Sequence, residues 1–290
     1  MRVEMVEGAD AAAAEDLAGR LWSWSSRWHP GELAWLWRAA GPGVASWRTA
    51  SWRAGGRTLA WARSTVPGRL DLQVDTAHDG LTPAVLDWFE DGAAGHDLAV
   101  TVLERESLLR EVLLSRGYSP DVDAPSFLHL RRRLAAASPP APLPPGYVLR
   151  SVVGAQDADA RTGLHRAAFA TPEPATATYR AVMAHPSYRP ALDRFVVAPD
   201  GTPAAAALGW LDPRSGVLAL EPVGTDPRFR RRGLARACVL AVLGAAVELG
   251  ATHARVCARD GAADPAPRAT YEAVGFRPYA RNVRLVRPAR

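Results

Sequence analysis

The segment whose residue types point most directly to chemistry is Arg230, Arg231, Arg232, Gly233, Leu234, Ala235 and Arg236. It follows a proline turn and opens an alanine- and leucine-rich stretch that ends near Leu249. Backbone N–H groups at a helix N-terminus bind anions, and a small residue such as Gly233 lets the backbone approach phosphates. Cations at that end oppose the helix dipole. The arginines therefore favour a bound anion over a solvated basic patch.

A second pattern is YEAVGF, from Tyr271 to Phe276. Taken alone, Tyr271 is typical of an amphipathic helix, with its ring in the core and its hydroxyl at the surface. The two segments together resemble the GNAT superfamily of N-acetyltransferases. The cofactor motif of that family has the form Q/R-x-x-G-x-G/A, and its second motif the form L-Y-E-x-x-G-F. The resemblance extends in element order over about residues 146–290.

This resemblance implies a role for each matching position. The backbone of Val223, Gly224 and Thr225 would bond the acyl-pantetheine chain of acetyl-CoA, and the arginine-rich turn would bind its pyrophosphate. Tyr271 would protonate the departing thiolate, which suits thioester aminolysis. Two positions depart from the pattern: Asp264 stands where asparagine is frequent, and Thr270 where leucine is usual. Asp264 stays a candidate cofactor contact, although a simple turn-initiating role is favoured.

The general base is less sharply defined. Glu221 lies two residues before Val223 on the same side of the expected strand, so it could face the acceptor amine directly or through a water. A structural ion pair with an arginine is an equal alternative. His165 is a further candidate, although a single helical histidine is more often packed or at the surface. His185, Tyr188 and Asp193 are expected to shape the acceptor pocket without a catalytic role.

The elements that position these residues follow from periodicity. Strands are expected at 147–153, 194–198, 202–211, 216–224, 252–258 and 276–287. Helices are expected from Asp157 to Phe169, from Leu234 to Leu249 and over 265–274. The resulting order is β-α-β-β-β-α-β-α-β.

The N-terminal half fits the same order. A helical region is expected from Ala11 to Trp37 with a break at Pro30, followed by strands at 44–54, 57–64 and 69–75. A helix at 81–95, a strand at 97–104, a helix at 106–117 and an extended segment at 118–134 complete it. Neither chemical motif is present: TAHDGL replaces the arginine turn, and Leu113 occupies the tyrosine position. Its tryptophans most simply fill the core and a domain interface.

The predicted fold class is α+β in three layers, with two tandem acyl-CoA N-acyltransferase folds. Each is expected to be a mixed, mostly antiparallel sheet flanked by helices. The proline-rich stretch 135–146 is interpreted as a linker. It separates a degenerate copy at 1–134 from an N-acetyltransferase domain at 147–290.

Composition and charge argue against several other classes of protein. The net charge is +5, but lysine is missing and the arginines are scattered among acidic residues, so a general nucleic-acid binder is not expected. Cys238 and Cys257 lack metal-ligand spacing and are interpreted as free thiols; no metal is expected. The acidic N-terminal stretch does not fit a signal peptide, and no apolar run suits a membrane, so a cytoplasmic location is predicted.

The predicted function is transfer of an acetyl group from acetyl-CoA to a primary amine by direct attack in a ternary complex. The expected partner is a small-molecule or peptide amine, and a homodimer remains an open alternative. One alternative function is a sensor or scaffold that binds acyl-CoA without turnover. Another is a tandem acyltransferase similar to mycothiol synthase.

Overall fold

The computed structural model describes residues 2–8, 10–135, 140–260 and 265–289. The candidate residue Asp264 lies outside this described part. The chain divides into two compact units. Unit 1 contains Met1–Leu33, Pro42–Leu128 and Ala280–Arg290, and unit 2 contains Ala34–Gly41 and His129–Tyr279.

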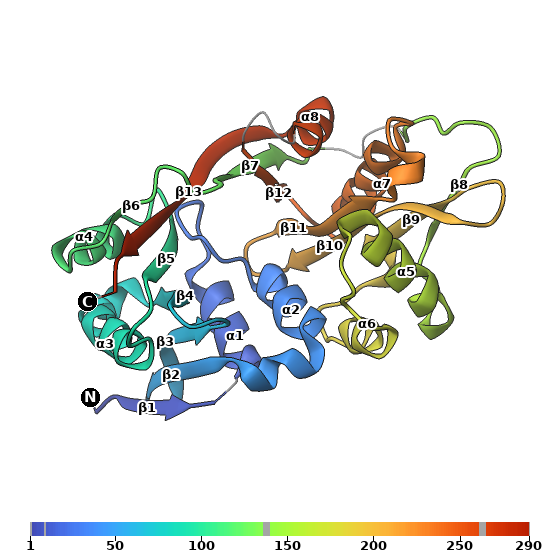
Figure 1. The fold of residues 1–290 in the computed structure, drawn as a ribbon. Coiled ribbons are helices and arrows are strands. Elements are labelled where there is room, and N and C mark those ends of the chain that lie inside the picture. Colours follow the sequence, from blue (N-terminus) through green and yellow to red (C-terminus); the bar gives the residue numbers. More distant parts are fainter. Residues whose placement is uncertain (1, 9, 136–139, 261–264, 290) are drawn as a thin grey trace. The chain divides into compact units, whose positions relative to one another are not determined.

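Unit 1 is a mixed sheet with helices (Figure 1). Its sheet has the order β1-β2-β3-β4-β5-β13, in which β4 and β5 run parallel and the other neighbouring strands run antiparallel. The elements are β1 (Glu4–Glu7), α1 (Ala11–Leu21), β2 (Arg48–Ala54), β3 (Arg57–Ser64), β4 (Arg69–Val74), α3 (Thr82–Gly92), β5 (Leu98–Leu103), α4 (Ser107–Ser115), β6 (Ser119–Pro120) and most of β13 (Arg277–Arg287). Alternate residues of β4 and β5, such as Leu70 and Val100, pack against α3 in one apolar core.

Unit 2 repeats this plan with the sheet order β7-β12-β11-β10-β9-β8. Its elements are β7 (Phe127–Arg133), β8 (Val148–Ser151), α5 (Ala158–Phe169), α6 (Thr176–Met183), β9 (Asp193–Val197), β10 (Pro203–Asp212), β11 (Val217–Thr225), α7 (Leu234–Glu248), β12 (His253–Arg259) and α8 (Ala266–Ala273). The helix α2 (Pro30–Ala39) begins in unit 1 and continues in unit 2 from Ala34. Short 3-10 turns occur at Gly41–Ser46, Thr76–Leu81, Ala155–Asp157, Pro190–Leu192 and Pro227–Phe229.

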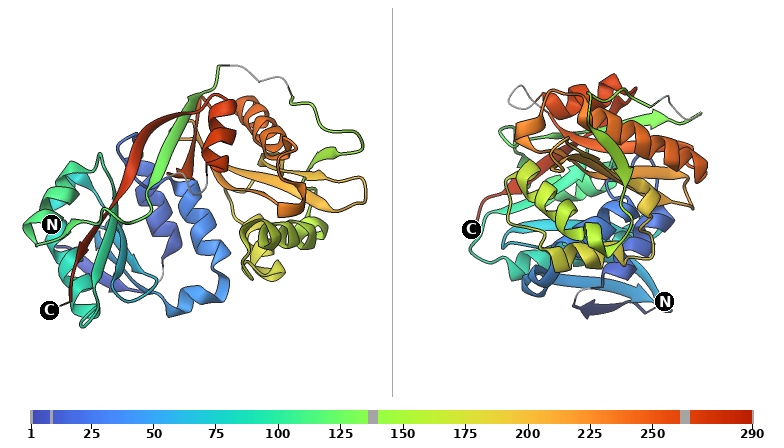
Figure 2. Two further views of the ribbon diagram at one scale, coloured as in Figure 1. Left: turned by 45° about the horizontal axis from the view of Figure 1, so that its top comes forward. Right: turned by 90° about the vertical axis from the view of Figure 1, so that its right-hand side faces the viewer.

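The sheet of unit 2 forms the middle of three layers. Both α5 and α7 contact β10 and β11, and the left view of Figure 2 shows the strands between α7 and the pair α5 and α6. Gly209 permits close packing, because a Cβ there would lie 2.7 Å from Val242 Cγ1 of α7. The predicted α+β class with mixed, mostly antiparallel sheets is confirmed.

Each unit takes one edge strand from the other half of the sequence. β7, which precedes the proline-rich stretch, neighbours β12 in unit 2. β13, which ends the second half, pairs antiparallel with β5, where Asn282 faces Leu103 and Arg287 faces Leu98. The compact units therefore do not coincide with residues 1–134 and 147–290.

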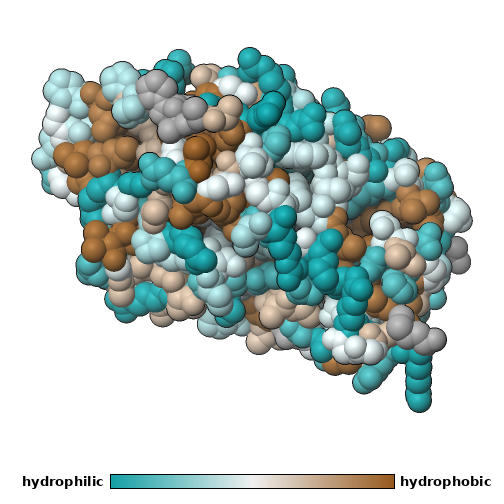
Figure 3. All heavy atoms as spheres, turned by 180° about the vertical axis from the view of Figure 1, so that it is seen from behind, coloured by the Kyte–Doolittle hydropathy of each residue, from teal (hydrophilic) through white to brown (hydrophobic). Residues whose placement is uncertain are grey.

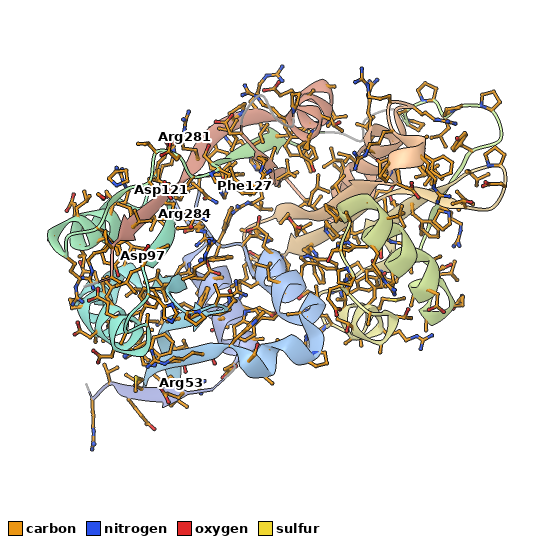
Figure 4. The ribbon with its side chains drawn as sticks, in the orientation of Figure 1. Arg53, Asp97, Asp121, Phe127, Arg281 and Arg284 are labelled. Carbon is orange, nitrogen blue, oxygen red and sulfur yellow. The ribbon has the colours of Figure 1, made fainter. Side chains whose placement is uncertain are left out.

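Charged side chains of unit 1 hold β13 through an ion pair and a hydrogen bond. Arg284 Nη1 lies 3.6 Å from Asp121 Oδ2, and both residues are labelled in Figure 4. Arg281 donates its backbone N–H to Glu104 Oε1 over 3.1 Å. Buried Leu285 adds an apolar contact to the core of unit 1. Hydrogen bonds, an ion pair and apolar packing therefore all hold β13 in unit 1.

Local details differ from expectation at the N-terminal end. The predicted helical region is interrupted over Trp22–His29, and Pro30 begins α2 instead of breaking a helix. A proline fits there because the first helical N–H has no partner within the helix. The strand β1 and the helix α6 were not predicted, since both are short and follow no strong period. Buried Trp28, Trp35 and Trp37 fill apolar interiors as expected.

The surface seen in Figure 3 is mainly hydrophilic, with separate hydrophobic areas. Exposed large apolar residues such as Val122 and Val153 are spread along the chain. Within the described ranges, no helix is long and apolar enough to cross a membrane.

Candidate acyl-CoA site in unit 2

The candidate site begins where β11 and β12 separate. These parallel strands pair from Val217 with His253 to Ala219 with Arg255. Beyond Ala219, β11 continues to pair with β10 on its other side, through Val223, Gly224 and Thr225. The pairing with β10 shifts by one residue between Leu220 and Val223, which marks a bulge in β11. We refer to the opening between β11 after Ala219 and β12 after Arg255 as the wedge.

The bulge in β11 is fixed from the neighbouring strand. Buried Trp210 of β10 donates its indole N–H to the carbonyl oxygen of Glu221 over 2.8 Å. Gly224 lies against α5, because a Cβ there would be 2.8 Å from Ala168 Cβ and 2.9 Å from the Phe169 ring. Any side chain at this position would push α5 away from β11. The sequence alone indicated neither contact.

The arginine-rich turn follows directly after β11. Asp226 accepts from the backbone N–H of Arg228 over 2.9 Å and binds its guanidinium at 2.7 Å, and this side-chain hydrogen bond lowers the pKa of Asp226. Arg231 has φ 64° and Gly233 has φ 77°. The left-handed backbone costs a residue with a side chain about 1–2 kcal/mol, so Arg231 is strained where Gly233 is not.

The three central arginines are exposed, and they differ in their contacts. Arg230 donates to the carbonyl oxygens of Thr225 and Ala168 at 3.4 and 3.3 Å. Arg232 donates to the Tyr147 hydroxyl over 2.6 Å. Among the described residues, Arg231 has no hydrogen bond or ion pair. None of these three arginines forms an ion pair with an acidic side chain in the described part of the chain, so the turn keeps a positive charge.

The N-terminus of α7 fits a phosphate group. Gly233 is its N-cap, no side chain caps the helix, and no acidic residue stands in its first turn. Ala237 makes the first hydrogen bond back to Gly233 O, at 3.1 Å, so the N–H groups of Leu234, Ala235 and Arg236 precede the helical ladder. A Cβ built on Gly233 meets no atom within 4 Å. Open space, free donors and positive charge coincide here, which suits a pyrophosphate.

The equivalent turn in unit 1 lacks the arginine cluster, because TAHDGL stands between β4 and α3. There Asp75 precedes the 3-10 turn and accepts from Ala77 N over 3.1 Å, as Asp226 accepts from Arg228 N in unit 2. The fully buried Leu113 of α4 stands at the position of Tyr271, as expected from the sequence.

Tyr271 of α8 lies deep in unit 2, with 6% of its surface exposed. Burial raises the pKa of its hydroxyl, and the charges of Glu221 and Cys257 raise it further. No hydrogen bond to this hydroxyl is found among the described residues. Tyr271 is therefore a protonated donor whose hydroxyl is influenced by the charges of Glu221 on β11 and Cys257 on β12.

His165 stands on the other side of β11, on α5. It lines a small pocket together with Phe169, Pro222 and Gly224, and its ring lies 4.6 Å from that of Phe169. Burial, and then the charge of Arg161, lower the pKa of His165 to about 4. The imidazole is therefore neutral at physiological pH.

Of the other predicted acceptor residues, Tyr188 and Asp193 belong to a buried polar network, and His185 packs separately. Asp193 accepts from Arg161 Nε at 2.8 Å, from the Tyr179 hydroxyl at 2.6 Å and from the Tyr188 hydroxyl at 2.9 Å. His185 accepts from Ser187 N and packs its ring against Trp210. These residues anchor α5 and α6 to β9. Arg161 and Tyr179 carry no local sequence signal for this role, since their partner is distant in the chain.

The fold and this site define a class of protein: an acyltransferase that uses acyl-CoA. Residues 161–276 match the Acetyltransferase (GNAT) family, and this part of the chain is a GNAT acetyltransferase domain. The predicted resemblance is confirmed, and the protein is a transferase of the EC 2.3.1 class.

Solved structures show the same fold over the whole chain. A tandem GNAT protein from the clavulanic acid biosynthesis pathway is 17% identical with a TM-score of 0.67, covering 100% of this chain and 99% of its own. A GCN5-related N-acetyltransferase from Sphaerobacter thermophilus is 19% identical with a TM-score of 0.63, covering 98% and 95%. A GNAT-family acetyltransferase from Colwellia psychrerythraea is 11% identical with a TM-score of 0.63, covering 99% of each chain. Comparison with curated proteins finds no significant match.

Proposed function

We propose that the protein is an N-acetyltransferase that moves the acetyl group of acetyl-CoA to a primary amine within a ternary complex. The observation that carries this proposal is the uncapped N-terminus of α7, where Gly233 leaves open space beside unneutralised arginines. The acceptor is a small-molecule or peptide amine, and the expected setting is cytoplasmic.

The wedge supports the proposal that the acyl-pantetheine chain lies along the free edge of β11. The edge of β11 that faces away from β10 lies along Val223 to Thr225, where β12 has already separated. Backbone N–H and C=O groups on such an edge can bond an extended chain like an additional strand. A backbone N–H near Val223 would polarise the thioester carbonyl as the amine attacks.

Two side chains serve proton transfer in this proposal. Tyr271 stays protonated because its pKa is raised, and it would donate to the departing CoA thiolate. Glu221 would accept the proton of the ammonium group, directly or through a water. His165 is less suitable as a base, since its pKa of about 4 makes it a weak proton acceptor at neutral pH.

The test measures release of free thiol from acetyl-CoA across amines that include aminoglycosides, amino acids and peptides. We expect turnover with at least one acceptor class and a mass increase of that acceptor by one acetyl group. Gly233→Glu serves as the matched control, because it blocks the anion site and leaves Tyr271 and Glu221 in place. Tight CoA binding without turnover on any amine would favour the sensor function instead.

A further inference from the structure

Cys257 of β12 lies in a polar cluster that the proposed reaction does not use. Its Sγ is 3.5 Å from Nδ1 and 3.7 Å from Nε2 of His129, and 3.7 Å from Nη2 of Arg255. His129 and Arg255 are both buried, whereas Cys257 is half-exposed. The thiol is thus accessible on one side and supported by nitrogen groups on the other.

The protonation of this cluster follows from its hydrogen bonds. Arg255 Nη2 lies 2.7 Å from His129 Nδ1. A guanidinium only donates hydrogen bonds, so Nδ1 accepts and the neutral ring carries its proton on Nε2. An Arg255 N–H therefore donates toward the sulfur, while the His129 ring lies beside it. The positive charge and the N–H of Arg255 favour a thiolate, which is the nucleophilic form of cysteine.

The position of Cys257 in the wedge brings it to the thioester end of the site. The last paired residues of β11 and β12 are Ala219 and Arg255. Two residues further on lie Glu221 on one wall of the wedge and Cys257 on the other. The charges of both residues act on the Tyr271 hydroxyl, and Tyr271 is nine-tenths buried and without a hydrogen-bond partner among the described residues. A CoA sulfur that Tyr271 protonates would thus enter the same wedge that Cys257 borders.

We propose that Cys257 is a modification site, at which the protein forms a mixed disulfide with coenzyme A inside its own cofactor site. This inference rests on the proposed function, since the nucleotide part of CoA would be held by the turn at Gly233. The co-reactant is CoA disulfide. The Cys257 thiolate attacks one sulfur of that disulfide, a bond forms between Cys257 and CoA, and the original S–S bond breaks. The departing CoA thiolate takes up the proton that Cys257 lost, so atoms and electrons balance.

The chain offers a matched control in its other cysteine. Cys238 of α7 is fully buried, its thiol lies 3.5 Å from the Ala205 carbonyl oxygen, and burial raises its pKa to about 12. Such a thiol is protonated and shielded. Modification is therefore expected at Cys257 and not at Cys238.

The experiment incubates the full-length protein with CoA disulfide and follows its mass and its acetyl transfer. We expect one CoA per chain, turnover reduced by about tenfold or more, and full recovery with dithiothreitol. Cys238→Ser should behave like the wild type, and Cys257→Ser should take up no CoA. Acetyl-CoA should slow the reaction by competition. Glutathione disulfide, which lacks the nucleotide, should react at least about tenfold more slowly.

Several outcomes would overturn this inference. One is a wild-type protein that binds reduced CoA in equilibrium dialysis but takes none up from its disulfide. Others are CoA uptake that persists in Cys257→Ser, or equal rates with the CoA and glutathione disulfides. If reduced CoA does not bind at all, the proposed function fails together with the inference, which separates the two failures.

Discussion

Arg231 and Gly233 both adopt a left-handed backbone, with φ 64° and 77°, on either side of Arg232. This pair of bends directs the chain from the end of β11 into α7. Because α7 has no side-chain cap, the bends also leave its first N–H groups open to an anion. The strain at Arg231 is compatible with a turn shaped for binding.

Two substitutions at Gly233 distinguish the effect of backbone strain from the effect of blocking the anion site. Gly233→Ala adds a Cβ into open space, so it should weaken CoA binding only through backbone strain of about 1–2 kcal/mol. Gly233→Glu places a carboxylate at the anion site and should abolish binding. Isothermal titration calorimetry with CoA measures both effects. Unchanged affinity in Gly233→Glu would contradict the assignment of the anion site.

Tyr271→Phe tests the proton donor. The ring is retained in its buried position, so CoA affinity should stay near the wild-type value while kcat falls by about 10²–10⁴. Steady-state kinetics combined with equilibrium binding gives the two quantities separately. A fully active Tyr271→Phe variant would remove this residue from the mechanism.

The lowered pKa of His165 predicts that the free energy of unfolding depends on pH. Its pKa is about 4 in the folded protein and ordinarily about 6.5, so the unfolded chain binds the proton more readily. Its contribution to stability is therefore complete above about pH 6.5 and is lost as the pH falls toward 4. Urea unfolding at pH 7.5 and 5.0 should show a smaller acid destabilisation in His165→Gln than in the wild type. Equal losses in both proteins would contradict this prediction.

The network around Asp193 should dominate the stability of unit 2. Asp193→Ala leaves the buried Arg161 guanidinium without its carboxylate and should lower the free energy of unfolding by about 3–5 kcal/mol. The control is Asp159→Ala, whose ion pair with Arg180 is exposed and 3.9 Å long, with an expected loss of about 0–1 kcal/mol. Denaturant titration compares them. Similar losses in the two variants would show that the buried pair has no special weight.

The exchanged edge strands predict how fragments behave. A fragment 147–290 lacks β7 beside β12 and carries a β13 whose partner β5 is missing, so it should aggregate or stay unfolded when expressed alone. Expression together with 1–146 should yield a soluble complex, detected by size-exclusion chromatography and circular dichroism. A soluble, folded, monomeric 147–290 would show that the exchanged strand is dispensable.

Sequence patterns predicted the elements near the site because these follow local rules. The strand before Val223, the turn through Gly233 and the helix after Leu234 combine period and turn chemistry over consecutive residues. The exchange of β7 and β13 was not predictable in this way. Both strands alternate in the same manner wherever they pair, and the pairing that places Asn282 opposite Leu103 is set by tertiary packing.

The candidate site also combines residues that sequence motifs identify with contacts that they do not identify. Tyr271 and the arginine turn could be assigned from motifs, whereas the contacts of His129 with Arg255 and Cys257 join residues far apart in the chain. The network of Arg161 and Asp193 is hidden for the same reason.

The pairing of β13 with β5 also sets the order of events during synthesis. Residues 98–103 leave the ribosome long before residues 282–287, which cover their free edge in unit 1. Domains usually fold as units while the chain emerges. The edge of β5 in unit 1 therefore stays uncovered until the acetyltransferase domain has been made.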